Sequence, residues 1–523
     1  MRAAHAVLLV GAFVTLSGFR PDDPDSAGLF KFEPGHDVEH HDGDGGVVRV
    51  HFTRTGPDAV SLVDQDTDGV PDTVEQVAAV YEEVLAFYLA QGFRSPVSDL
   101  DVNTGDGGSD AFDVYLIDFG GQADGAFVRD NCLPSKPVCS GFAAQENDFA
   151  GYGYPNFRTA SRILASHELF HAVQAAYDAD VGANWGEATA TWASEHFDPS
   201  LSDFEYFIRG WFESPDRTLD QEPIGPVDGF SYGLAIFPQY LSERFGDTVI
   251  RQHWEDLEDG ARGVLNPTWL DALVALLQRE HTTTFEEAFV EFAQWVIRSG
   301  QGQAEGTFAN ASNYPRVSRE LVSLPFYDER LRVYRASMQV WGASPGGRPV
   351  VAAAIADPTP TVLDGLTLIV GARKGATVTT VLGEVTRDGV LMAELELGGG
   401  GADEVIAVVV NHMTEGQSKR PGLCIGSPVE VEACVATKVP AVVEPEPELE
   451  VEPGPEPEVE PGAELAEAEA AEVTEVDEPQ INPTKDNDDG CGGGPLGAPA
   501  TVALLGLSAL LPRLRGRAIH RAL

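Results

Sequence analysis

The sequence predicts an α+β domain with a helical second half, followed by an all-β sandwich. Three observations carry this prediction. Residues 46–148 mix strand-like segments with one long amphipathic helix, residues 202–300 carry apolar side chains at helical spacing, and residues 331–440 alternate apolar and polar side chains. The chain has 523 residues, 43% of them hydrophobic, which is enough for more than one buried core.

The first domain is expected between residues 46 and 325. Its segments VVRVHFTR and FDVYLIDF predict strands, and TVEQVAAVYEEVLAFYLAQGF predicts a helix that ends at Gly92. The later segments FSYGLAIFPQYLSERFG, TWLDALVALLQREH and TTFEEAFVEFAQWVIRS predict helices. Strand segments such as PVVAAAIA, LTLIVGA and VIAVVVNHM, separated by Gly, Pro and Asp, predict the sandwich from 331 to 440.

The start of the chain has the order of a secretory signal peptide. MRAAH precedes the apolar run AVLLVGAFVTLSGF, which is too short to cross a membrane comfortably and is followed by the polar PDDPDSAG. We assign residues 1–20 to this signal and expect residues 21–45 to be flexible. A buried first strand or helix is the alternative.

The acidic charge is concentrated near the other end. The formal net charge is −49, and residues 441–489 hold eighteen acidic side chains against one lysine. This Pro- and Glu-rich segment is expected to be an extended linker because its charges repel one another. Such acidity excludes nucleic acid as a partner. We expect the remaining acidic residues to serve solubility and calcium binding.

Residues 490–523 combine a Gly-Cys pair, a mostly apolar run and an arginine-rich end. This order resembles the MYXO-CTERM sorting tag of exported myxobacterial proteins. The resemblance implies processing at Cys491 and membrane association through a transmembrane helix. The protein would then be anchored at the cell surface or outer membrane, or secreted after C-terminal processing. A C-terminal helix docked on the folded core is the alternative.

The other four cysteines predict two local disulfides. Cys132 and Cys139 flank LPSKPV, and Cys424 and Cys434 flank IGSPVEVEA. An exported chain favours disulfides over free core cysteines, and C-x2-C zinc spacing is absent.

The stretch HELFHAVQAAYDADVGANWGEATATW predicts a metal centre. His167 and His171 lie one turn apart on the same face of a helix, with Glu168 beside them. A hydrolytic zinc site needs a third protein ligand, and Glu187 follows on a second predicted helix. A purely structural metal site and a helix without metal are the alternatives.

HELFH followed by WGEATA resembles the gluzincin zinc peptidases. The resemblance implies that His167, His171 and Glu187 bind Zn²⁺ and that Glu168 is the general base. The chain departs from some members by its short spacing between His171 and Glu187 and by Thr191, where they have an acid.

The family pattern also suggests two further features. Tyr232 is the candidate for stabilising the oxyanion, and a core tyrosine at the start of a helix is the alternative. Residues 140–149, SGFAAQENDF, are expected to form an edge strand that pairs with extended substrate. From Asp64 to Gly300 the chain is similar to zinc metalloproteases encoded with MYXO-CTERM tags, with landmarks such as DQDTDGVPDTVE, FDVYLIDF and SYGLAIFPQYLSERFG.

The stretch DQDTDGVPDTVE predicts a calcium loop of twelve residues with a glycine at its sixth position. The expected Ca²⁺ ligands are Asp64, Asp66, Asp68, the carbonyl of Val70, Asp72 and Glu75. A strand or coil before the loop and a helix after it are expected, and an acidic helix cap is the alternative. Asp106, Asp110 and Asp113 offer oxygens for a second ion, and a Gly-rich turn explains them equally well.

The sequence therefore predicts an exported, monomeric zinc-dependent endopeptidase with a calcium-stabilised catalytic domain and protein or peptide substrates. The alternative is a catalytically inactive surface adhesion or binding protein that retains a peptidase fold. Its sandwich would then hold the partner.

Overall fold

The structure is a computed structural model that describes residues 20–23, 26, 30–102, 107–201, 203–300, 306–329, 331–356, 363–416 and 418–438. The predicted acidic linker, the sorting segment with Cys491 and most of the predicted signal peptide lie outside these residues. Within the described ranges, no helix combines the length and the apolar character needed to cross a membrane.

A five-stranded mixed sheet organises the N-terminal part. Its central strands are parallel to one another, and an antiparallel strand lies at each edge. In spatial order the strands are β1 (Val38–Asp42), β2 (Val48–Thr53), β3 (Phe112–Ile117), β5 (Cys139–Glu146) and β4 (Gly125–Cys132). β1 lies within residues 21–45, which we expected to be flexible. Its polar sequence does not predict a strand, and its order comes from pairing with β2.

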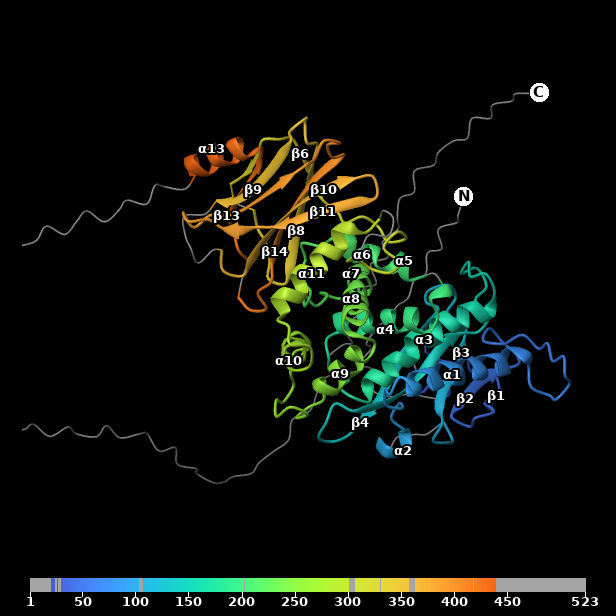
Figure 1. The fold of residues 1–523 in the computed structure, drawn as a ribbon. Helices are drawn as coiled ribbons and strands as arrows, with labels where there is room; N and C mark the ends of the chain where they lie inside the picture. The colour runs from blue at the N-terminus through green and yellow to red at the C-terminus, as the bar shows by residue number, and fades with distance from the viewer. Residues whose placement is uncertain are drawn as a thin grey trace, which may run out of the picture. The chain divides into compact units, whose positions relative to one another are not determined.

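One face of this sheet packs against helices α1 (Asp72–Ala90) and α3 (Phe157–Ala175) (Figure 1). Strand residues alternate between faces, so Val48, Val50 and Phe52 enter the core shared with these helices. The expected helix ending near Gly92 is confirmed by α1, and an α+β architecture is confirmed for this part of the chain.

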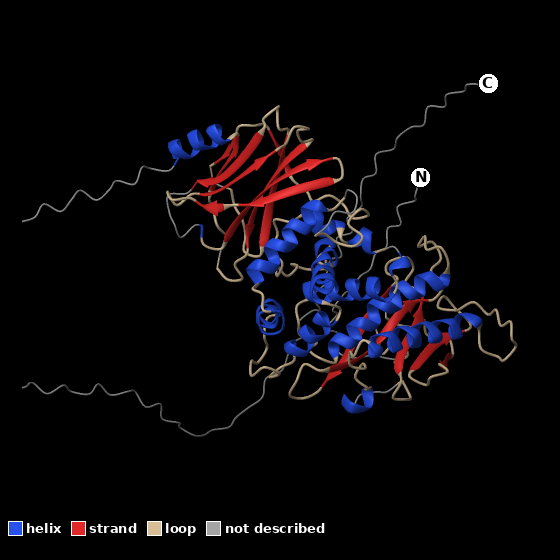
Figure 2. Ribbon diagram, in the orientation of Figure 1, coloured by secondary structure: helices blue, strands red, loops and turns tan. Residues whose placement is uncertain are grey.

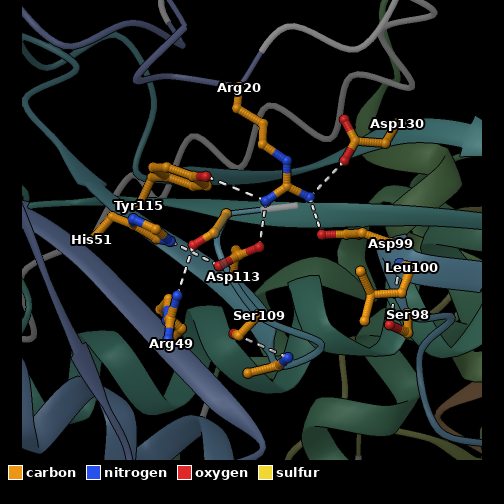
Figure 3. Close-up of polar contacts among 12 residues, drawn as sticks. Arg20, Arg49, His51, Ser98, Asp99, Leu100, Ser109, Asp113, Tyr115 and Asp130 are labelled. Carbon is orange, nitrogen blue, oxygen red and sulfur yellow. Dashed lines mark hydrogen bonds and ion pairs between the residues drawn. The ribbon is translucent and has the colours of Figure 1, made fainter. Parts of the chain in front are cut away.

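The opposite face of the sheet carries a smaller core and a buried polar cluster. Phe30 and Phe32 pack there on Phe119 and Tyr115. Arg20 reaches the same face, although we assigned it to the signal peptide. Its guanidinium donates to carboxylates from short helix α2 (Asp99–Val102), from β3 and from β4, namely Asp99, Asp113 and Asp130 (Figure 3).

Asp113 therefore does not serve a second calcium site. One of its oxygens accepts from Arg20, and the other lies 2.7 Å from Nε2 of His51 (Figure 3). Asp106, the first residue of the suggested set, lies outside the described residues. Burial raises the pKa of Asp99 to about 7, although Arg20 opposes this shift.

Helices fill the rest of the N-terminal half, and α4 (Ala183–Phe197) packs directly on α3. A capping box at Thr284 and Glu287 starts the last of these helices. The series after α4 comprises the 3-10 turn η1 (Pro199–Leu201), α5 (Phe204–Phe207), α6 (Arg209–Glu213), α7 (Gly229–Gly233), α8 (Ile236–Phe245), α9 (Thr248–Leu257), α10 (Trp269–His281) and α11 (Phe285–Arg298).

Two five-stranded sheets form the predicted sandwich, whose strands are red in Figure 2. Side chains from both sheets share one core. The first sheet has the order β11 (Thr377–Leu382), β10 (Leu366–Lys374), β14 (Glu404–Asn411), β8 (Ser337–Ala343) and β6 (Glu320–Val322). The second has the order β12 (Glu384–Val385), β13 (Leu391–Glu396), β9 (Val350–Ala356), β15 (Gly422–Gly426) and β7 (Phe326–Asp328).

The sandwich differs from the expectation in two respects. β6 pairs with β8 in parallel, so the sandwich begins before residue 325. Helix α13 (Pro428–Lys438) packs on β9 and β15, although residues 331–440 were expected to contain only strands. Both predicted disulfides are present, Cys132–Cys139 between β4 and β5 and Cys424–Cys434 between β15 and α13.

Candidate metal centre

Helix α3 presents His167 and His171 from the middle of the N-terminal domain. The side chain of Asn156 caps the helix by accepting from the amide of Thr159. The helix lies between the sheet and α4, so both histidines are buried, with 2% and 5% exposure. Rigid elements thus position both imidazoles.

Helix α4 brings Glu187 to the two histidines. Oε2 of Glu187 lies 3.1 Å from Nε2 of His167 and 3.6 Å from Nε2 of His171, and the two Nε2 atoms are 3.2 Å apart. Zinc bonds of about 2.0–2.1 Å in a tetrahedron separate neighbouring ligand atoms by about 3.3–3.4 Å. The three donor atoms therefore have the spacing that a zinc ion requires, and the short connection after His171 allows α4 to reach α3.

Gln174 fixes the orientation of His171. Its Oε1 lies 2.8 Å from Nδ1 of His171, while its Nε2 donates to the carbonyl of Gly186 at 2.8 Å and to Oγ1 of Thr189 at 2.9 Å. The two donated bonds orient the amide so that its oxygen faces the imidazole. Nδ1 of His171 then carries a hydrogen, so Nε2 is the nitrogen that can offer a lone pair to a metal ion beside Glu187 and His167.

The three candidate ligands are also electrostatically coupled. Burial would raise the pKa of Glu187, but the two histidines outweigh it and lower this pKa to about 2. Burial would likewise lower the pKa of His171, but the charge of Glu187 raises it to about 9. The carboxylate therefore stays ionised and favours a positive charge beside it, from a protonated histidine or from a metal ion.

Glu168 lies beside the ligands and contacts β4. Its Oε2 accepts from the amide of Phe127 at 2.6 Å, and its Oε1 is buried without a hydrogen-bond partner among the described residues. Burial raises the pKa of Glu168, and the charge of Glu187 adds to this effect. One carboxylate oxygen is thus held by the backbone while the other remains available.

The edge strand next to Glu168 is β4 and not the segment that we expected. Residues 139–146 form β5, which lies between β3 and β4. Its continuous burial predicts an interior strand, whereas β4 becomes exposed toward its end. Gly125 on β4 allows close approach to α3, because a Cβ atom there would lie 2.4 Å from Leu164.

Tyr232 belongs to α7, and its ring lies 6.0 Å from the ring of His167. Asp228 caps this short helix by accepting from the amides of Phe230 and Ser231. Gly210 lets α6 cross α7, because a Cβ atom there would lie 1.7 Å from the carbonyl oxygen of Gly229. The structure thus brings Tyr232 to the metal candidate.

The predicted calcium loop forms a second cluster of possible metal ligands. Carboxylate oxygens of Asp64, Asp66 and Asp72 lie within 4.8 Å of one another, as do those of Asp66, Asp68 and Glu75. Burial raises the pKa of Glu75, and repulsion by Asp68 and Asp66 adds to this effect. The acidic groups thus lie close enough to repel one another.

Backbone amides hold the loop in shape. The carboxylate of Asp64 accepts from Thr67 at 2.7 Å and from Gly69 at 3.0 Å, and the amide of Val70 donates to Asp68 at 2.8 Å. Gly69 has a φ of 99°, which favours glycine. Pro71 occupies the cap position of α1, and Asp72 and Glu75 lie in the first turn of this helix.

The comparisons with known proteins identify no family. No family model and no curated protein matches the chain. Among solved structures, the pre-peptidase C-terminal domain of a Bacillus anthracis collagenase is 6% identical and covers 21% of this chain and 93% of its own, with a TM-score of 0.15. A 4-O-methyl-α-glucuronidase is 11% identical and covers 52% of this chain and 30% of its own, also with a TM-score of 0.15. At these scores neither likeness carries an inference.

Two contributors to the site did not emerge from the sequence analysis. Gln174 stands three residues after His171, and this helical spacing would have placed it on the same face. The amide of Phe127 gives no signal, because any residue other than proline supplies the same donor.

Proposed function

We propose that the protein is a zinc-dependent endopeptidase with a zincin-like catalytic domain of the gluzincin type. The observation that carries this proposal is the buried set of His167, His171 and Glu187 with zinc-compatible spacing. Glu168 beside them favours catalysis over a purely structural ion, since a structural site needs no base.

The chain's own residues define the mechanism. When bound, zinc would supply Lewis-acid activation of a water molecule and of the scissile carbonyl. Glu168 accepts a proton from the attacking water through its unpartnered Oε1 and passes it to the leaving amine. The backbone amide of Phe127 holds the other carboxylate oxygen. Burial raises the pKa of Glu168, which favours its holding a proton between the two transfers. Tyr232 is the proposed donor to the oxyanion.

We propose extended peptides or proteins as substrates, aligned along β4. The amide of Phe127 points away from β5 because it donates to Glu168, so one side of β4 is not used for pairing within the sheet. An extended peptide pairs naturally with such an edge. The reacting carbonyl would then pass next to Glu168.

Calcium is proposed as a structural ion in the Asp64–Glu75 loop. The loop precedes α1, which packs directly on α3, so an ordered loop supports the element that carries the histidines. Export is proposed on the strength of the two disulfides, which persist in oxidising compartments. Surface anchoring through residues 490–523 and a monomeric state remain proposals from the sequence.

The test compares the wild type with Glu168→Gln. We expect peptide hydrolysis to fall by roughly 10²–10⁴-fold, because the general base is lost. One bound zinc per chain should remain, measured by mass spectrometry under native conditions. Glu280→Gln changes an exposed glutamate on α10 and should keep full activity.

Proteolysis that survives in Glu168→Gln would contradict the assigned mechanism. A wild-type protein that binds zinc but cleaves no member of a broad peptide library would favour the non-catalytic surface protein.

A further inference from the structure

A cavity of about 500 Å³ lies in the sandwich, far along the chain from the metal candidate. It is bordered by edge strand β6, by β8 and by residues at the ends of β10 and β14. Its lining combines aliphatic side chains, such as Leu321 and Val322, with the guanidinium groups of Arg316 and Arg373.

Arg373 is buried without enough partners. Its side chain is 5% exposed, and its Nη2 donates to the carbonyl of Ile297 at 2.8 Å. Its Nε lies 3.4 Å from Oε2 of Glu404 without forming a hydrogen bond, and its Nη1 has no hydrogen-bond partner among the described residues. A buried guanidinium nitrogen without a partner is costly, so its retention requires an explanation.

The surrounding charges do not balance Arg373. Arg319 also binds Glu404, so this one carboxylate serves two guanidinium groups, and Arg316 adds a third positive charge. Asp403 is used elsewhere, because it accepts from the amide of Gly375 and pairs with Lys374. Burial lowers the pKa of Arg373, and the charge of Arg316 adds to this effect. The lining holds two arginines and two carboxylates, but both carboxylates also pair with cations outside the lining, Arg319 and Lys374.

We propose that this cavity binds the terminal carboxylate of an extended peptide, with Arg373 and Arg316 as its donors. Arginine forms paired hydrogen bonds with carboxylates, and the Nε and Nη1 atoms of Arg373 are without a hydrogen-bond partner among the described residues. This proposal is independent of the peptidase activity, because it concerns binding alone.

The edge strand favours a peptide over other anions. Among the residues that the structure describes, β6 pairs only with β8, and Leu321 is 75% exposed beside the cavity. A peptide can add to this edge and place an apolar side chain on Leu321 while its carboxylate enters the cavity. The lining contains no aromatic side chain on which a sugar ring would stack, and Glu404 would repel a phosphate dianion more strongly than a carboxylate.

The experiment measures binding of the tetrapeptide acetyl-Ala-Leu-Val-Leu with a free carboxylate to the full-length Glu168→Gln protein by calorimetry. The same peptide with an amidated terminus is the matched ligand. We expect the acid to bind at least tenfold more tightly than the amide and to weaken as salt increases. Arg316→Gln and Arg373→Gln should each remove this preference, and Lys374→Gln should preserve it.

Equal binding of acid and amide, or no binding of either, would overturn the proposal. A preference that survives in Arg316→Gln would also overturn it, and this exposed position tests the idea even if Arg373→Gln does not fold. Inorganic phosphate or glucuronate binding more tightly than the peptide would overturn the assignment of a peptide ligand.

Discussion

The two candidate metal sites of the N-terminal domain are held in opposite ways. His167, His171 and Glu187 are buried on two packed helices, and their neighbours are side chains such as Gln174. The Asp64–Glu75 loop is largely exposed, and its carboxylates are bonded mainly to amides of the loop itself. Helix packing therefore sets the geometry of the buried site, whereas hydrogen bonds within the loop set the geometry of the loop.

This difference predicts different consequences of losing the metal. Removal of an ion from the buried site should affect chemistry more than folding, because helix packing already sets the spacing of its ligands. Removal from the loop should affect stability, because mutual repulsion of the carboxylates would no longer be offset.

The largest effect is expected for His171→Ala. Bound zinc should fall from one ion per chain to none, because a ligand and its link to Gln174 are both removed. Mass spectrometry under native conditions measures the occupancy. His253→Gln is the control, since His253 is buried against Trp185 on α4 without joining the site. Zinc retained by His171→Ala, or absent from the wild type, would refute the site.

A smaller effect is expected for Gln174→Leu. Zinc affinity should weaken by roughly 10–100-fold, because the hydrogen bond that orients His171 is lost. Competition with a zinc chelator measures the affinity. Gln174→Glu keeps an acceptor for Nδ1 of His171 and should bind zinc more tightly than Gln174→Leu. Equal affinity for the wild type and Gln174→Leu would show that helix packing alone sets the ligand geometry.

The third effect is expected on calcium removal, and it concerns stability and not zinc affinity. Chelation by EGTA should lower the melting temperature by on the order of 5 °C, because an ion at about a hundred times its Kd contributes about 2.7 kcal/mol. Calcium should restore the melt when zinc is kept constant, and Asp66→Asn should be insensitive to EGTA. An unchanged melt of the wild type in EGTA would argue against a calcium loop.

The sequence predicts elements best where hydrophobic periodicity is strong. The helix at 72–90 and the strands of the sandwich form where their apolar periodicity predicts them. Both disulfides predicted from the local spacing of the cysteines are present. β1 escaped prediction because VEHHD has no apolar alternation, and its order comes from pairing with β2. The position of β5 inside the sheet was equally hidden, because strand order is a tertiary property.

For the candidate site, the HExxH spacing was sufficient to place two histidines and a glutamate on one helix. The prediction of Glu187 as a third ligand required the chain after His171 to turn back onto the helix. In the structure, Oε2 of Glu187 lies 3.1 Å from Nε2 of His167. The hydrogen bond from the amide of Phe127 to Glu168 could not be predicted from the sequence. It forms where β4 contacts α3, and its donor is a backbone group.

Arg20 lies at the boundary of the predicted signal peptide and belongs to the folded domain. Its single guanidinium pairs with Asp99, Asp113 and Asp130 on the face of the sheet opposite α3 (Figure 3). A leader peptidase that cut after Arg20 would leave these buried carboxylates without that cation, and losing one partner of a buried ion pair costs about 3–5 kcal/mol. If the proposed signal peptide is removed, the position of the cut relative to Arg20 therefore decides whether the sheet keeps this cation.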